Sequence, residues 1–299
     1  MRYAIKKLLT CGLLLSAVHL TTPAKAVDLN SMDYIPAPDG TSIAAFYTTF
    51  TQRSTYQAIG GQEIKNGTSL DSSVEIFRFV HYMDIGGVTI APQVLIPVGS
   101  LFDAKIGGQP IRSTWGVADL IFAAPVWLVN NQQAGTAFAI TPYLFAPVGN
   151  YDFGRVLNMG ENRWKFDLQA GLQQQFLKDF NWQLAGDVMW YGTNSDALTR
   201  GIGRLTQSQS YQFQTWISYS PPSDQTWRFA IGYSKLMGGA QRLDGILNGS
   251  ATRADQIRFE VSKFVAPDWQ ILGMVQHDIA ASGGFKEDFR GTIRILKLF

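Results

Sequence analysis

Cysteine and charged residues are both scarce in this sequence of 299 residues. Cys11 is the only cysteine, so the chain cannot form an internal disulfide or a metal site of several cysteines. Charged residues make up 16% of the chain, whereas about a quarter is usual for a soluble protein. The low charge indicates that much of the surface does not face water.

Histidine is also scarce, which limits the possible chemistry. Beyond residue 26 only His81 and His277 remain, on different predicted strands. Catalysis by a Ser–His or Asp–His pair needs a histidine oriented by a third polar group, and neither signature is present. The segments 158–162 and 278–288 contain oxygen ligands without a complete calcium-loop spacing. We therefore predict no enzyme, no cofactor and no metal site.

Residues 1–26 have the order of a secretory signal peptide. A basic stretch, 2–7, precedes an apolar run from Leu8 to Leu20, and Ala24-Lys25-Ala26 is a small-x-small cleavage site. The apolar run is too short to cross a bilayer, which takes roughly 20 residues in a helix. We predict export with cleavage after Ala26, which leaves 21 Lys+Arg against 23 Asp+Glu. No basic stripe remains that would indicate nucleic-acid binding.

Long apolar runs are absent after the signal peptide, yet aromatic residues reach 13% and glycine numbers 29. An apolar exterior without helical spans is typical of a transmembrane β-barrel, whose strands alternate between a lipid face and a lumen face. The run from Trp164 to Leu177 shows this alternation. Trp164, Phe166 and Leu168 share one face, and Lys165, Asp167 and Gln169 share the other. In a helix, alternate residues do not share a face, so both sets would be distributed around the circumference.

About twelve runs alternate in this way. The clearest are 164–177, 180–191, 227–234 and 257–262, and the others are 42–52, 72–83, 88–96, 117–129, 136–146, 208–219, 269–278 and 288–299. Pro92, Pro125 and Pro142 fall inside three of them, which predicts bulges or ragged ends there. The sequence therefore predicts an all-β, antiparallel up-and-down barrel of about twelve strands over residues 41–299.

The connections between these runs alternate in length. The short ones are 84–87, 130–135, 178–179, 220–225 and 265–268, and the long ones are about 53–71, 97–116, 147–163, 192–207, 236–253 and 279–287. Outer-membrane barrels have short periplasmic turns and longer external loops. The alternation predicts the outer membrane of a Gram-negative bacterium, with outer-membrane lipid as a partner.

Strand parity directs a set of charged side chains into the lumen, because Arg or Lys facing lipid at mid-depth costs about 2–4 kcal/mol. The predicted lumen residues are Asp119, Lys165, Asp167, Asp187, Arg228, Arg258, Glu260, Arg290 and Arg294. They could pair across strands and rigidify the barrel, or line a polar path. Residues 27–40 precede the first strand and could form a plug in the lumen or a periplasmic tail.

Several segments resemble the bacterial outer-membrane family labelled after the meta-pathway of phenol degradation. They are Asp33-Tyr34-Ile35-Pro36-Ala37-Pro38-Asp39-Gly40, Pro147–Asp152, Asn158–Trp164 and Arg294–Phe299. The resemblance spans nearly the whole chain after residue 26, and Asn158–Trp164 is its most specific part. The family is similar to channels for hydrophobic compounds, including the long-chain fatty acid transporter.

The resemblance implies a porin-like barrel that passes or binds a small hydrophobic or aromatic ligand. We expect passive uptake, with capture by aromatic side chains such as Phe77, Phe79 and Tyr143. The alternative is a non-transporting structural or interaction barrel that uses its external loops. The terminal Phe299 resembles the signal read by barrel-insertion machinery, which together with periplasmic chaperones would be a partner. Lys297 departs from the aromatic residue expected near this end.

Overall fold

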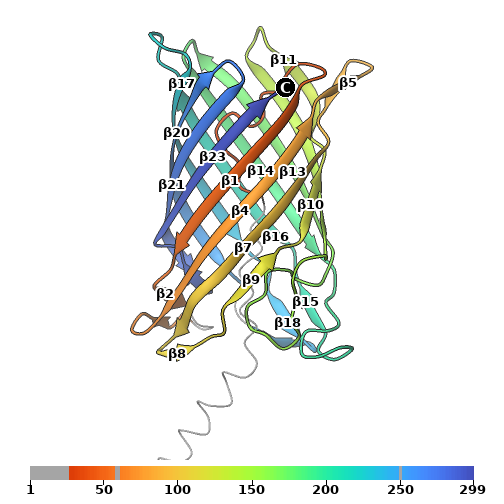
Figure 1. Ribbon diagram of the computed structural model, residues 1–299, viewed down its shortest axis with the longest axis vertical. Helices are drawn as coiled ribbons and strands as arrows, with labels where there is room; N and C mark the ends of the chain where they lie inside the picture. The colour runs from red at the N-terminus through yellow and green to blue at the C-terminus, as the bar shows by residue number, and fades with distance from the viewer. Residues whose placement is uncertain (1–26, 58–60, 249–250) are drawn as a thin grey trace, which may run out of the picture.

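The computed structural model describes residues 27–57, 61–248 and 251–299, and within these it is a closed antiparallel β-barrel (Figure 1). The wall has twelve strands: β1 (Ser42–Gln52), β4 (Ser69–His81) extended by β5 (Met83–Ile85), β6 (Val88–Ile90) with β7 (Gln93–Ile106), β9 (Thr114–Val117) with β10 (Leu120–Ala123) and β11 (Val126–Asn131), β12 (Thr136–Ala146), β13 (Lys165–Leu177), β14 (Phe180–Tyr191), β16 (Ser210–Tyr219), β17 (Trp227–Met237), β20 (Arg253–Ala266), β21 (Trp269–Ser282) and β23 (Phe289–Leu298). The predicted signal peptide lies outside the described residues.

The barrel closes because β1 pairs with both β4 and the last strand, β23. Ile43 lies opposite Leu298 at one end of the β1–β23 pair, and Gln52 lies opposite Phe289 at the other. Closure leaves no free edge in the wall, so every wall strand has a hydrogen-bonded neighbour on each side. The predicted antiparallel barrel is confirmed. Among the described residues, no helix is long and apolar enough to span a membrane.

The two faces of the wall differ sharply in polarity. In β16, Phe213 and Ile217 are 40% and 47% exposed on the outside, whereas Gln214 between them is 1% exposed on the inside. The same alternation runs through β13, β14, β20 and β21. A fold that exposes its large apolar side chains and buries its glutamines is suited to hydrocarbon outside and to a polar interior.

The two ends of the barrel also differ. The short connections and the C-terminus lie at one end, which we call the short-turn end, and the long connections lie at the other, the long-loop end (Figure 1). At the long-loop end two small sheets form, and β8 (Gln109–Pro110) pairs with the end of β7. The sheets consist of β2 (Thr55–Gln57), β3 (Glu63–Ile64) and β22 (Gly284–Lys286), and of β15 (Leu205–Gln207), β18 (Gln241–Leu243) and β19 (Ile246–Leu247).

One predicted long connection, 97–116, is wrong, because β7 continues to Ile106 and β9 begins at Thr114. Pro97 and Gly99 are typical of turns, but here they lie within a paired strand. A Cβ on Gly99 would lie 2.4 Å from the carbonyl oxygen of Ser73 on β4. The glycine therefore permits close approach of two backbones and does not mark a turn.

The three prolines that were expected to disturb strands differ in their effect on the wall. Pro92 and Pro125 lie in breaks between strand segments, as predicted, and the Ala91 N–H donates to the Pro125 carbonyl at 3.0 Å. Pro142 causes no break in β12. It lies beside the break between β10 and β11, where its carbonyl accepts from the Ala124 N–H at 3.3 Å. Its missing N–H therefore falls where the neighbouring strand is already interrupted.

The C-terminus explains the unexpected Lys297. The Lys297 ammonium pairs with the Asp268 carboxylate at 2.7 Å and lies over the rings of Trp269 and Phe299, 4.7 and 5.4 Å from their centroids. A cation stacked on two aromatic rings is compatible with the aromatic belt of a barrel end.

Candidate functional site

The segment Asp28–Tyr34, which we call the inner segment, lies inside the barrel. Its backbone is held by two buried indoles: Trp216 donates to the Leu29 carbonyl at 3.2 Å, and Trp127 donates to the Tyr34 carbonyl at 2.8 Å. Gln214 accepts from the Leu29 N–H at 3.0 Å. These partners come from β11 and β16, so the inner segment crosses the lumen between distant strands.

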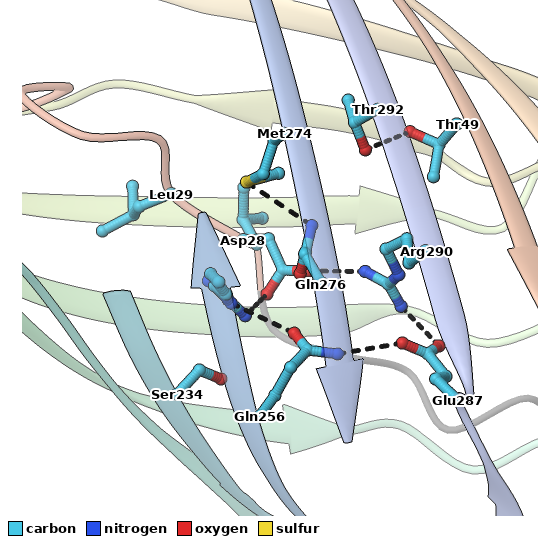
Figure 2. Close-up of polar contacts among 12 residues, drawn as sticks. Asp28, Leu29, Thr49, Ser234, Gln256, Met274, Gln276, Glu287, Arg290 and Thr292 are labelled. Carbon is cyan, nitrogen blue, oxygen red and sulfur yellow. Dashed lines mark hydrogen bonds and ion pairs between the residues drawn. The ribbon is translucent and has the colours of Figure 1, made fainter. Parts of the chain in front are cut away.

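Two arginines hold the start of the inner segment. The Asp28 carboxylate accepts from Arg258 of β20 at 2.6 Å and from Arg290 of β23 at 2.7 Å. Arg290 also bonds Glu287 at 2.5 Å, and Gln256 donates to Glu287 at 3.1 Å (Figure 2). Because hydrogen bonds between ionised groups are the strong ones, Asp28 is the most firmly held polar group of the segment.

A second charged group holds the middle of the inner segment. Glu260 accepts from the Ser31 hydroxyl at 2.5 Å and from the Asn30 amide at 3.0 Å. Arg294 donates to Asn30 at 3.1 Å and pairs with Asp33 at 3.4 Å. Glu260 and Arg294 are 2% and 5% exposed, and such buried charges are costly unless they are satisfied. The inner segment supplies those partners.

The end of the inner segment packs against a glycine. The Tyr34 hydroxyl donates to Gln169 at 2.8 Å, and the Tyr34 ring lies over Gly171 of β13. A Cβ on Gly171 would lie 1.9 Å from the Tyr34 Cζ atom. Only a residue without a side chain fits beneath the ring.

We therefore expect Gly171→Ala to displace Tyr34 and loosen the inner segment, which should increase ion conductance in planar bilayers several-fold. The matched control is Gly186→Ala on the outer face of β14, where the added Cβ would meet the nearest atom at an ordinary 3.9 Å. An equal conductance of the two variants would contradict this assignment.

Two cavities of the described barrel lie toward its two ends. The long-loop cavity has a volume of about 330 Å³, with an apolar wall that includes Leu101, Leu157 and Phe285 and a charged wall that includes Arg290 and Glu287. The short-turn cavity has a volume of about 270 Å³ and is lined by Ser31 to Asp33 of the inner segment and by side chains of β1, β4 and β23.

A compact ion cluster shapes the mouth of the barrel. Glu161, in the long loop after β12, pairs with Lys165 and Arg163, each at 2.6 Å. Burial by itself would raise the pKa of Glu161, but the two cations lower it from 4.5 to about 2. Asp119 accepts from the backbone N–H of Glu161 at 3.1 Å and fixes the same loop.

This cluster predicts an acid-sensitive loop. Because the folded-state pKa of Glu161 is depressed, its stabilising effect is present above about pH 4.5 and is lost as the pH falls through about 2. We expect faster proteolysis of the loop 147–163 over that interval. The variant Glu161→Gln should give the faster cleavage already at neutral pH. Cleavage that is the same in both proteins at every pH would contradict the prediction.

The predicted lumen residues fall into separate groups. Arg258, Glu260, Arg290 and Arg294 contact the inner segment, whereas Lys165 and Asp119 organise the long loop 147–163. Arg228 lines the short-turn cavity together with Arg294. Asp187 accepts from Gln169 at 3.2 Å on the opposite wall. Asp167 is fully buried, and neither of its carboxylate oxygens has a hydrogen-bond partner among the described residues.

Two aromatic residues do not lie where capture of a ligand needs them. Phe77 and Phe79 are 44% and 50% exposed on the outer face, because the residue between them, Arg78, points inward to Gln93. Tyr143 does face the lumen, where its hydroxyl contacts Gln169. Phe77 and Phe79 therefore do not lie where they could capture a ligand inside the lumen, in contrast to the expected capture by these side chains.

The two histidines lie apart from both cavities. His81 is hydrogen-bonded to the Ser42 hydroxyl at 2.9 Å at the short-turn end, and His277 contacts the Asp288 carbonyl. Within the part of the chain that the structure describes, no group of three or more His, Cys, Asp or Glu side chains could hold a metal ion.

Sequence reasoning did not single out Asp28, Asn30, Trp216 or Glu287. Parity does place Trp216 on the inner face with Gln212 and Gln214, so that signal was available. The pairing of Asp28 with Arg258 has no local signal, because the two residues are 230 positions apart.

Comparisons with known proteins agree with the barrel. The crystal structure of the COG4313 outer membrane channel from Pseudomonas putida F1 matches with a TM-score of 0.85 and 30% identity, over 91% of this chain and 100% of that one. The β domain of the Bordetella autotransporter BrkA matches in fold alone, with a TM-score of 0.53 and 10% identity, over 87% of this chain and 100% of that one. Comparison with curated protein sequences gives no match.

The family comparison covers most of the barrel. The model of the family described as "Putative MetA-pathway of phenol degradation" matches residues 52–295, from the end of β1 to within β23. The matched range includes the ion cluster at the mouth and the arginines that hold Asp28. The chain therefore belongs to this phenol-degradation family of β-barrels.

Proposed function

We propose that the protein is an outer-membrane channel of a Gram-negative bacterium, which takes up small hydrophobic or aromatic compounds by passive diffusion. The long-loop cavity carries the proposal. Its volume of about 330 Å³ is within the range of small-molecule sites, and its wall is mostly apolar, with charged groups at one side. Phe285 of β22, which lines the cavity, packs edge-on against Tyr56 of β2, with ring centroids 5.2 Å apart.

In this proposal the inner segment is a plug. It separates the long-loop cavity from the short-turn cavity, and its displacement would join them into one path. The similarity to an outer-membrane channel supports the same role. Transport would be passive and non-enzymatic, and the insertion machinery and periplasmic chaperones would be partners during assembly, with Phe299, 69% exposed, as the insertion signal.

The test measures uptake by intact cells whose lipopolysaccharide blocks the diffusion of apolar solutes. We expect cells that express the protein to take up radiolabelled toluene several-fold faster than cells with an empty vector. Uptake of a disaccharide should be equal in the two. Equal toluene uptake, with the barrel shown to be folded in the outer membrane, would overturn the proposal and favour the non-transporting barrel.

A further inference from the structure

The contact between Asp28 and its two arginines defines a site for a carboxylate. Arg258 is 1% exposed, and besides Asp28 it donates to Gln214 at 2.8 Å and Gln256 at 3.0 Å. The second Asp28 oxygen accepts from Arg290 at 2.7 Å (Figure 2). The guanidinium forks are thus fixed in place around one carboxylate, which the chain itself supplies.

This carboxylate site lies at the edge of the long-loop cavity. Arg290 forms part of the cavity wall and bonds Asp28 at the same time. The lining of the same cavity also contains Leu70, Leu101 and Leu157. A molecule with an apolar body and an anionic end could therefore rest against the leucines and place its anion on Arg290.

Asp28 supplies one of the negative charges around this point. Among the residues that the structure describes, one connected network of ion pairs and hydrogen bonds contains three cations and three anions: Arg53, Arg258, Arg290, Asp28, Asp278 and Glu287. Removal of the Asp28 carboxylate leaves the network with one excess positive charge. A single carboxylate restores neutrality, whereas a neutral or cationic ligand does not.

We infer that the preferred ligands are small aromatic or apolar molecules with one carboxylate, and that the ligand carboxylate replaces Asp28 on Arg258 and Arg290 and so releases the inner segment. This inference rests on the proposed function and specifies its ligand class. Asp28 competes with the ligand carboxylate for Arg258 and Arg290. Because Asp28 is tethered to the barrel, its effective concentration is on the order of millimolar, so the wild-type protein binds such ligands weakly. The ligand thereby opens the path that it uses.

The experiment measures binding of benzoate to the detergent-solubilised barrel by calorimetry, with benzyl alcohol as the neutral analogue. In Asp28→Ala the competitor is gone, and we expect benzoate to bind at least about tenfold more tightly than to wild type. The isosteric Asp28→Asn should show the same gain if Asp28→Ala folds poorly. Benzyl alcohol should bind equally to all three proteins. In the double variant Asp28→Ala/Arg290→Gln, the gain for benzoate should disappear.

The possible outcomes separate this inference from the proposed function. If neither Asp28 variant gains affinity for benzoate, or if benzyl alcohol gains as much, the carboxylate site is refuted, even where toluene uptake is normal. If benzoate binding follows the expected pattern but toluene uptake fails, the ligand site stands and the proposed uptake does not.

Discussion

Asp28→Asn will raise the open probability of the channel by about a hundredfold. Asp28 is held by Arg258 and Arg290 at 2.6 and 2.7 Å, and Arg258 is almost completely buried. Loss of one partner of a buried ion pair costs about 3 kcal/mol, and about 1.4 kcal/mol corresponds to a factor of ten in an equilibrium. The asparagine keeps the shape of the side chain but presents no charge to the two arginines.

Single-channel recording in planar bilayers measures this effect directly. The control is Asp39→Asn, near the inner segment, where the carboxylate is exposed and accepts from the Asp84 N–H at 2.8 Å. We expect wild-type behaviour from that control. If Asp28→Asn opened no more often than Asp39→Asn, the inner segment would not be the part of the molecule that closes the channel.

Ile231→Arg will destabilise the folded barrel by about 2–4 kcal/mol. Ile231 is 47% exposed at the middle of β17, where it lies opposite Ile217 and Phe259 on the outer face. An arginine there must place its guanidinium in hydrocarbon or thin the bilayer around it. The loss of stability follows from the position of the side chain and requires no change in the lumen.

Denaturant unfolding in phospholipid vesicles, followed by tryptophan fluorescence, gives the free energy of unfolding. Val265→Arg is the matched control, because Val265 is 54% exposed on the outside but lies near the short turn between β20 and β21. Near the interface the same charge costs only about 0–1 kcal/mol. Equal destabilisation by both arginines would mean that the outer face of β17 is not at mid-depth in the membrane.

The wall of the barrel was largely predictable because its signal is local. The predicted run 42–52 coincides with β1, 136–146 with β12, and 180–191 with β14. Side chains alternate between faces at every step of a strand, so an apolar outside and a polar inside appear as a period of two. The prediction from local sequence failed where turn-forming residues lie within a strand, as at Gly99 in β7. This glycine is needed because the backbone of the neighbouring strand β4 leaves no room for a Cβ atom.

The candidate site was predictable only in part. Parity selected Arg258, Glu260, Arg290 and Arg294 as inward-facing, and all four contact the inner segment. Strand parity shows which face of the wall a side chain is on, but it does not show which residue that side chain contacts. It could therefore not decide whether these charges pair with one another or line a path. The pocket-lining side chains Leu101 and Phe285 come from a strand and a loop sheet that meet only when the barrel closes.

By itself the sequence determined the wall: alternation along each strand, and alternation of short and long connections, require a closed sheet with an apolar exterior. The tertiary structure alone decided what fills that wall. Asp28 meets Arg290 across 262 positions of the chain, and no periodicity connects residues so far apart. Their contact exists because closure brings β20 and β23 around the inner segment, where buried charges require partners.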